Sequence, residues 1–169
     1  NNIRVYLPYA TAAENFDDRS WKEEWTASSL VRRCDGCNIS IQRKGQTYDR
    51  KPSPCIAPNC NCKPIGRLVV IVRELKRLAY VEVATTSTWD ILEISRNLNA
   101  FQSLRGDLRG IPFILKRTPR MISTPAKEGE RVRREKWLIS IEPDPQWVEA
   151  MLSATQRAAL PGGAEPLEL

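Results

Sequence analysis

Apolar and β-branched residues in the second half of the chain recur at the spacing that is typical of strands. The apolar run 68–72 predicts a short buried strand, and residues 78–86 predict a second strand, because β-branched and aromatic residues are frequent there. The link 73–77 between them indicates a hairpin or a tight crossover. Residues 111–117 predict a third strand, and residues 135–142 predict a fourth. In the fourth strand three apolar residues alternate onto one face: Trp137, Ile139 and Ile141.

Two helices are predicted between and after these strands. The first begins after a cap at Ser87 or Thr88 and ends at Gly106. Its apolar residues recur at helical spacing: Ile91, Ile94, Leu98, Phe101 and Leu104. The second helix has Asp144 as its cap and Pro145 at its first position. We expect four of its residues to form a buried stripe: Trp147, Val148, Met151 and Leu152.

The remaining segments are assigned from their composition. A short helix is predicted over residues 20–33, because Trp21, Trp25 and Leu30 fall on roughly one side, and its aromatic residues are expected in the core. Residues 118–129 contain two Pro and a Gly and are predicted to form a loop.

The composition excludes a large part of catalytic chemistry, because the 169 residues include no His. Serine or cysteine nucleophiles that are activated by imidazole are therefore excluded, as are zinc sites with His ligands. No apolar run approaches the ~20 residues of a membrane-spanning helix. No basic-then-apolar signal segment is visible either, so we expect a cytoplasmic protein.

All five cysteines lie within residues 34–62, in a segment with few large apolar side chains. Their pattern is Cys34-x2-Cys37, then Cys55-x4-Cys60-x-Cys62, and without His a tetrahedral zinc site needs four thiolates. We therefore expect a closed structural zinc site whose binding energy folds residues 34–64. Disulfides, an iron–sulfur cluster and free thiols are the alternatives, and the spacing alone does not identify the fifth, spare cysteine.

The net charge of +6 is concentrated in two segments. Residues 31–77 carry +8 and residues 105–136 carry +6, whereas both ends of the chain are acidic. A basic block is typical of a surface that faces nucleic acid or an acidic protein partner, although it is also compatible with a solvated surface. The basic residues that we single out for such a partner-facing surface are Arg131, Arg133, Arg134 and Lys136.

The order of several short motifs resembles a known family. The run Arg32-Arg33-Cys34-Asp35-Gly36 is followed by Pro54-Cys55, by Cys60-Asn61-Cys62-Lys63-Pro64 and by Arg67-Leu68-Val69-Val70, and Gly110-Ile111-Pro112-Phe113 comes later. This order, over roughly residues 30–142, resembles the recombination directionality factor-like family of phages that use large serine integrases. The resemblance implies a choice of zinc ligands: Cys34, Cys55, Cys60 and Cys62, with Cys37 as a possible substitute.

The same resemblance implies a regulatory protein and not an enzyme. Such a factor binds the serine integrase and switches it from integration to excision, and DNA takes part through the complex. No small-molecule substrate and no membrane are expected. The alternative is a zinc-containing nucleic-acid-binding subunit of another mobile-element or defence complex, and an enzyme such as a metal-dependent hydrolase is the third possibility.

These observations together predict an α+β fold, with a small mixed or antiparallel sheet, two helices and an inserted Cys-rich zinc-binding segment. The expected organisation has four parts: an N-terminal aromatic segment that packs on the core (1–33), a zinc knuckle (34–64), an α+β core domain (65–160) and a flexible acidic tail (161–169).

Overall fold

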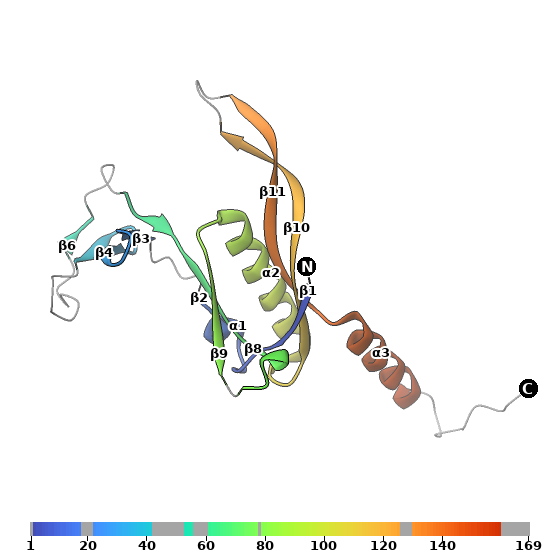
Figure 1. Cartoon of the computed structure of the whole chain (residues 1–169). Helices are drawn as coiled ribbons and strands as arrows, with labels where there is room; N and C mark the ends of the chain where they lie inside the picture. The colour runs from blue at the N-terminus through green and yellow to red at the C-terminus, as the bar shows by residue number, and fades with distance from the viewer. Residues whose placement is uncertain are drawn as a thin grey trace, which may run out of the picture.

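Two antiparallel sheets, one large and one small, make up the framework of this computed structural model, which describes residues 2–17, 22–41, 53–55, 61–77, 79–125 and 130–159 (Figure 1). The large sheet contains β1 (Asn2–Tyr6), β2 (Phe16–Asp17), β8 (Gly66–Val72), β9 (Tyr80–Thr85), β10 (Pro112–Pro125) and β11 (Arg131–Pro143). The small sheet has the order β6-β5-β4-β3-β7. Its strands are β3 (Lys22–Trp25), β4 (Leu30–Cys34), β5 (Asn38–Ile41), β6 (Ser53–Pro54) and β7 (Lys63–Pro64). The expected α+β class is therefore confirmed.

The strand β8 is the centre of the large sheet. The strand β9 pairs with it along one edge. Along the other edge lie two short strands, because Tyr6 of β1 is opposite Ile71 and Phe16 of β2 is opposite Leu68. The short helix α1 (Ala12–Asn15) connects these two strands and begins with a capping box, in which Thr11 and Glu14 bond reciprocally.

The core lies between this sheet and α2 (Thr88–Arg105), which begins at the cap Ser87 and ends at Gly106. Ile94 and Leu98 of α2 are fully buried. A Cβ atom at Gly66 would lie 2.7 Å from Phe16 and 2.8 Å from Ile91, so only glycine permits this approach of helix and sheet. The buried cluster comprises Val5, Leu7, Ala12, Phe16, Leu68, Val70, Ile94, Leu98, Leu108, Ile111, Phe113 and Ile141.

The helix α2 also covers the free edge of β11. The backbone N–H of Ile139 donates to Asp90 Oδ1 at 3.2 Å, and the Asn97 side chain donates to the carbonyl of Ile141 at 3.1 Å. Asp90 and Asn97 are seven residues apart, so they lie on the same side of the helix. Because these polar side chains satisfy the unpaired backbone groups of an edge strand, this part of β11 is closed to another strand.

Beyond the end of β1, β10 and β11 continue as a two-stranded ribbon (Figure 1). The predicted loop at 118–129 is therefore wrong for residues 118–125, which belong to β10. Proline is tolerated at positions 119 and 125 because the backbone nitrogens of both residues point away from β11, toward the edge of β10 that β1 no longer covers. The N–H groups that proline lacks would therefore make no hydrogen bond to a neighbouring strand.

The helix predicted over residues 20–33 is also wrong, because the described residues there form β3 and β4. Glu23 lies opposite Arg33 and Glu24 lies opposite Arg32, so complementary charges pair across the two strands. Trp25, expected in the core, is 52% exposed. Residues 2–17 join the large sheet, whereas residues 22–34 join the small one.

The C-terminal helix α3 (Pro145–Ala159) begins where predicted, and Asp144 Oδ1 accepts the backbone N–H of Gln146 at 2.9 Å. Its first turn is anchored by Trp147, whose ring contacts Phe101 edge-on and lies beneath Arg105. The predicted buried stripe is wrong, because Val148 and Met151 are half-buried and Leu152 is 60% exposed. The predicted tail at 161–169 lies outside the described residues.

No helix in the described ranges is long and apolar enough to cross a membrane.

Candidate functional site

Two of the expected zinc ligands, Cys34 and Cys55, lie together in the small sheet. Cys34 is the last residue of β4 and is buried, and Cys55 directly follows β6. Their Sγ atoms are 3.2 Å apart, which is too far for a disulfide of ~2.05 Å. Two thiolates on one tetrahedral zinc, each at ~2.3 Å, would lie ~3.8 Å apart. The two sulfurs would therefore have to move apart by about 0.6 Å to share one zinc ion.

The turn after Cys34 places a backbone N–H beside its sulfur. The backbone N–H of Gly36 donates to Cys34 Sγ at 3.1 Å. Gly36 has a φ of 97°, which side chains with a Cβ rarely adopt. Asp35 Oδ1 closes the turn by accepting the backbone N–H groups of Asn38 and Cys37, which hold the pKa of Asp35 below its usual value.

Cys37 and Cys62 are placed differently. Cys37 is exposed, and its carbonyl accepts the backbone N–H of Cys55 at 2.7 Å, which ties the two cysteine-bearing loops together. Cys62 is half-buried in the segment before β7, and Cys60 lies outside the described residues. Within the described ranges, no three His, Cys, Asp or Glu side chains are grouped around a potential metal position. The structure therefore brings together one pair of the expected ligand set.

A buried carboxylate, Glu23 of β3, connects the small sheet to the large one. Its side chain is fully buried and accepts hydrogen bonds from three residues. Arg67 Nη2 of β8 donates at 2.6 Å, Arg33 Nη2 of β4 at 2.8 Å and Trp25 Nε1 at 2.8 Å. Burial raises the pKa of Glu23, but the bonds from Arg67, Trp25 and Arg33 outweigh this effect, so its pKa lies below the ordinary value of 4.5.

Sequence reasoning missed this carboxylate. The usable signal was the pair Glu23-Glu24, followed eight residues later by Arg32-Arg33. Two acidic and two basic residues at this spacing match as opposite positions of an antiparallel hairpin. The aromatic residues nearby favoured a helix instead.

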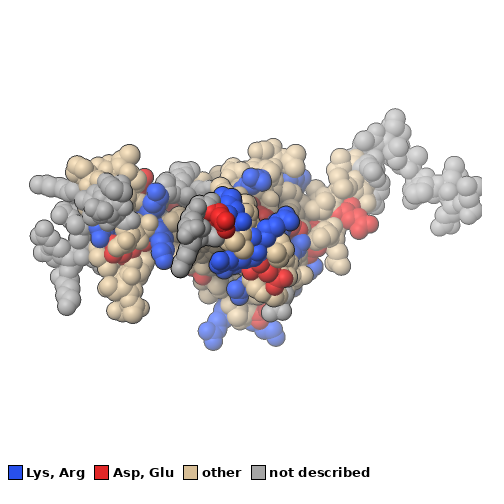
Figure 2. Space-filling model, turned by 90° about the horizontal axis from the view of Figure 1, so that it is seen from above, with Lys and Arg blue, Asp and Glu red and all other residues tan. Residues whose placement is uncertain are grey.

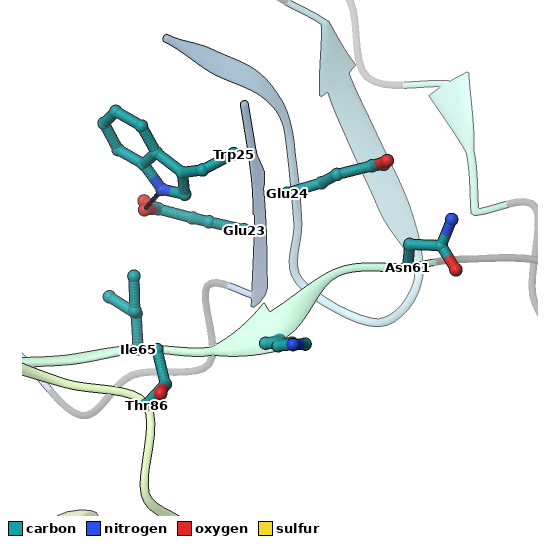
Figure 3. A pocket seen from close by; sticks show the side chains of 7 residues that line it. Glu23, Glu24, Trp25, Asn61, Ile65 and Thr86 are labelled. Atoms are coloured by element: carbon teal, nitrogen blue, oxygen red, sulfur yellow. Dashed lines mark hydrogen bonds between the residues drawn. The ribbon is translucent and has the colours of Figure 1, made fainter. Parts of the chain in front are cut away.

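An open cleft of about 490 Å³ marks the place where the two sheets meet (Figure 3). It is lined by Glu23, Glu24, Trp25, Asn61, Lys63, Ile65 and Thr86. Both carboxylates in this set are already hydrogen-bonded to arginines, Glu23 to Arg33 and Arg67 and Glu24 to Arg32. The indole of Trp25 is held by Glu23 with much of its surface exposed. The cleft is therefore bordered by Glu23 and Trp25, which take part in the hydrogen bonds where the two sheets meet.

Three arginines of the first basic segment and four cations of the second have different environments. In the first segment, Arg32, Arg33 and Arg67 form ion pairs with Glu24 and Glu23 at 2.5–2.8 Å. In the second segment, four residues are exposed: Arg131, Arg133, Arg134 and Lys136. None of these four forms an ion pair with a described acidic residue. The first set of charges is therefore used inside the protein, and the second faces solvent.

These features define an α+β protein with a cysteine pair in a small sheet and an exposed basic ribbon on a large one. The sequence matches the model of the Gp3-like family, described as recombination directionality factor-like, over residues 1–143. The chain therefore belongs to the recombination directionality factor-like family, as its motif order predicted. This membership supports a regulatory role in recombination. No curated protein and no solved structure matches the chain.

Proposed function

We propose that this chain binds a serine integrase and switches it from integration to excision. The observation that carries the proposal is the family match, which spans 143 of the 169 residues and includes every strand of both sheets. The proposal names the recombinase class and the direction of the switch.

The switch itself would be a matter of binding free energy and not of chemistry on this chain. A recombinase with two arrangements responds to a partner only as far as that partner binds one arrangement more tightly. The structure offers two sheets for such contacts, the small one and the large one, and the ion pair between Glu23 and Arg67 joins them. A partner could therefore contact both sheets at once.

A zinc ion is part of the proposal as a structural group. Cys34, Cys55, Cys60 and Cys62 would hold it, since the first two already converge and the four thiolates would complete a tetrahedron. When bound, zinc would supply folding free energy to a sheet of short strands that has little apolar core of its own. Cys37 remains the spare residue in this arrangement.

Recombination assays with purified components test the function directly. The integrase encoded near this chain is given a left and right junction pair, or a phage and host attachment pair, with and without the chain. We expect junction recombination only when the chain is present, together with reduced recombination of the attachment pair. An integrase that captures the chain but keeps the same direction on both substrate pairs would contradict the proposal.

The alternative, a nucleic-acid-binding subunit of another complex, is favoured by one observation, the solvent-facing charges of the second basic segment. It predicts DNA or RNA binding with no effect on any integrase. The same recombination assay therefore separates the two functions.

A further inference from the structure

We propose that the distal part of the β10–β11 ribbon enters a groove of duplex DNA and contacts the phosphates on both of its walls. We call residues 117–125 and 130–136 the basic arm. The arm contains six basic and two acidic residues, a net charge of +4. The proposal goes beyond the integrase contact, because it assigns DNA binding to this chain itself.

The first argument is that the charges of the arm are available. Four of its six cations, Arg117, Arg133, Arg134 and Lys136, are exposed and form no ion pair with a described acidic side chain. Two other arginines are used within the protein, since Arg120 pairs with Glu93 of α2 and Arg131 donates to Ser123 across the ribbon. Three of the available cations, at 133, 134 and 136, lie within four consecutive positions, so their repulsion is relieved best by an external polyanion.

The second argument is the distribution of these cations over both faces of the ribbon. Side chains alternate along a strand, so Arg133 points to one face, whereas Arg134 and Lys136 point to the other. Directly opposite residues share a face, which places Lys136 beside Arg120 and Arg134 beside Ile122. A phosphate-lined groove offers anions on two sides at once, whereas a flat acidic surface would contact only one face.

The third argument is the shape of the arm. The strand β1 begins at Asn2, opposite Lys116, so no described strand flanks the part of β10 that follows Lys116. Nine paired positions, from Arg117 to Pro125, extend the ribbon by about 30 Å. Figure 2, which looks down on the molecule from above, shows Lys and Arg side chains gathered over its middle. The major groove is ~12 Å wide and admits a two-stranded ribbon of this kind.

The composition of the arm favours DNA over an acidic protein. Protein interfaces concentrate apolar and aromatic residues at their centre. Among the described positions of the basic arm, the exposed large apolar side chains are Met121 and Val132, and the exposed Trp137 lies at the base of the arm, opposite Pro119. Arginine predominates over lysine, and its planar guanidinium matches phosphate oxygens in a bidentate manner. These features point to contacts with the backbone of DNA and not to a buried apolar anchor.

Binding of a fluorescent 30-base-pair duplex to the purified full chain, measured by anisotropy over a range of salt concentrations, tests the proposal without integrase. The double variant Arg133→Ala/Arg134→Ala removes one exposed cation from each face. We expect it to weaken DNA binding about tenfold or more at low salt, and to reduce the slope of log K against log salt by about 1.8, since each lost phosphate contact accounts for ~0.9.

Two further variants serve as controls. Arg73→Ala/Arg96→Ala removes two exposed arginines outside the arm and should bind DNA like the unchanged chain. Arg133→Lys/Arg134→Lys keeps the charge and should retain most of the affinity. Two results would overturn the proposal: no DNA binding at low salt, or equal loss in the arm variant and the Arg73/Arg96 control. A third would assign the arm to a protein partner, namely lost integrase capture with unchanged DNA binding. Because the assay omits the integrase, its failure is distinct from failure of the proposed function.

Discussion

Glu23 on β3 and Arg67 on β8 form a 2.6 Å ion pair that joins the two sheets of the molecule. The carboxylate is fully buried, whereas the guanidinium is 21% exposed and reaches the surface, where it also meets Glu82 at 3.3 Å. A single arginine therefore has one buried and one exposed acidic partner. Replacing each carboxylate in turn therefore compares how much a buried and an exposed ion pair of the same arginine contribute to the stability of the protein.

Replacing Glu23 should destabilise the protein far more than replacing Glu82. Glu23→Gln leaves Arg67 and Arg33 facing a neutral amide in a buried position, and we expect a loss on the order of 3 kcal/mol in the free energy of unfolding. Glu82→Gln, the matched control, removes an exposed partner and should cost less than about 1 kcal/mol. Urea denaturation of both variants measures the difference. Equal losses would show that the burial of Glu23 does not increase its contribution to the free energy of unfolding.

The pKa of Glu23 gives this contact a pH dependence of known sign. Because the folded-state pKa lies below the ordinary 4.5, the unfolded chain binds the proton more readily. The stabilisation is therefore complete above the unfolded-state pKa and is lost as the pH falls through the folded-state pKa. The stability difference between the unchanged chain and Glu23→Gln, followed by denaturation from pH 7 downward, should shrink below about pH 4.5. A difference that grows on acidification would contradict this assignment.

The cysteines of the small sheet should differ in importance. Cys34→Ser and Cys55→Ser should each abolish tight zinc binding and unfold the small sheet, because these two sulfurs converge. Cys37→Ser should be mild, because Cys37 contributes its backbone carbonyl and keeps it in the variant. Zinc content by elemental analysis and amide hydrogen exchange of β3–β5 provide the readouts. Equal damage from all three substitutions would mean that Cys37 is also a ligand.

The edge of β11 depends on Asp90, whose carboxylate accepts hydrogen bonds from the backbone N–H of Ile139 and from the hydroxyl of Thr85. The backbone N–H of Asp90 itself donates to the side chain of the N-cap, Ser87. Asp90→Ala leaves the partly buried N–H of Ile139 without its partner, and we expect a loss of about 1–3 kcal/mol. Asp107→Ala, an exposed residue paired only locally with Arg109, is the control and should stay within about 1 kcal/mol. Thermal unfolding of both variants checks this prediction. A small effect at Asp90 would mean that water replaces the carboxylate at this edge.

The sequence identified the elements whose local signals agree with their tertiary surroundings. The helix over 88–105 was predictable because Ser87 caps it and Gly106 ends it, and because four residues at helical spacing face the core: Ile91, Ile94, Leu98 and Phe101. The distal ribbon was not, because Pro119 and Pro125 indicate a loop unless it is known that β1 stops short of them. Likewise, the hairpin of β3 and β4 depends on charge pairs between strands, which a helical reading of Trp21, Trp25 and Leu30 ignores.

The candidate sites were also predictable only where the signal is local in the sequence. The density of cysteines predicted a common site, and the structure brings Cys34 and Cys55 together. The ligand set beyond this pair stays a prediction, since spacing does not report distances in space. The two basic segments looked alike in the sequence. In the structure, Glu23 and Glu24 form ion pairs with Arg32, Arg33 and Arg67, whereas the cations at 133, 134 and 136 face solvent.

The path of the chain into and out of the small sheet has a consequence for how such proteins can diverge. The chain leaves the large sheet at Asp17 and returns at Gly66, and Asp17 lies opposite Arg67 across the β2–β8 pair. The two ends of the intervening segment therefore meet at one hairpin, which a short turn could close. The cysteine-bearing sheet is an insertion, and its length and sequence can change without shifting the register of any strand in the large sheet. A chimera that exchanges residues 18–65 between relatives should thus keep the large sheet and its arm while it acquires the other protein's small sheet.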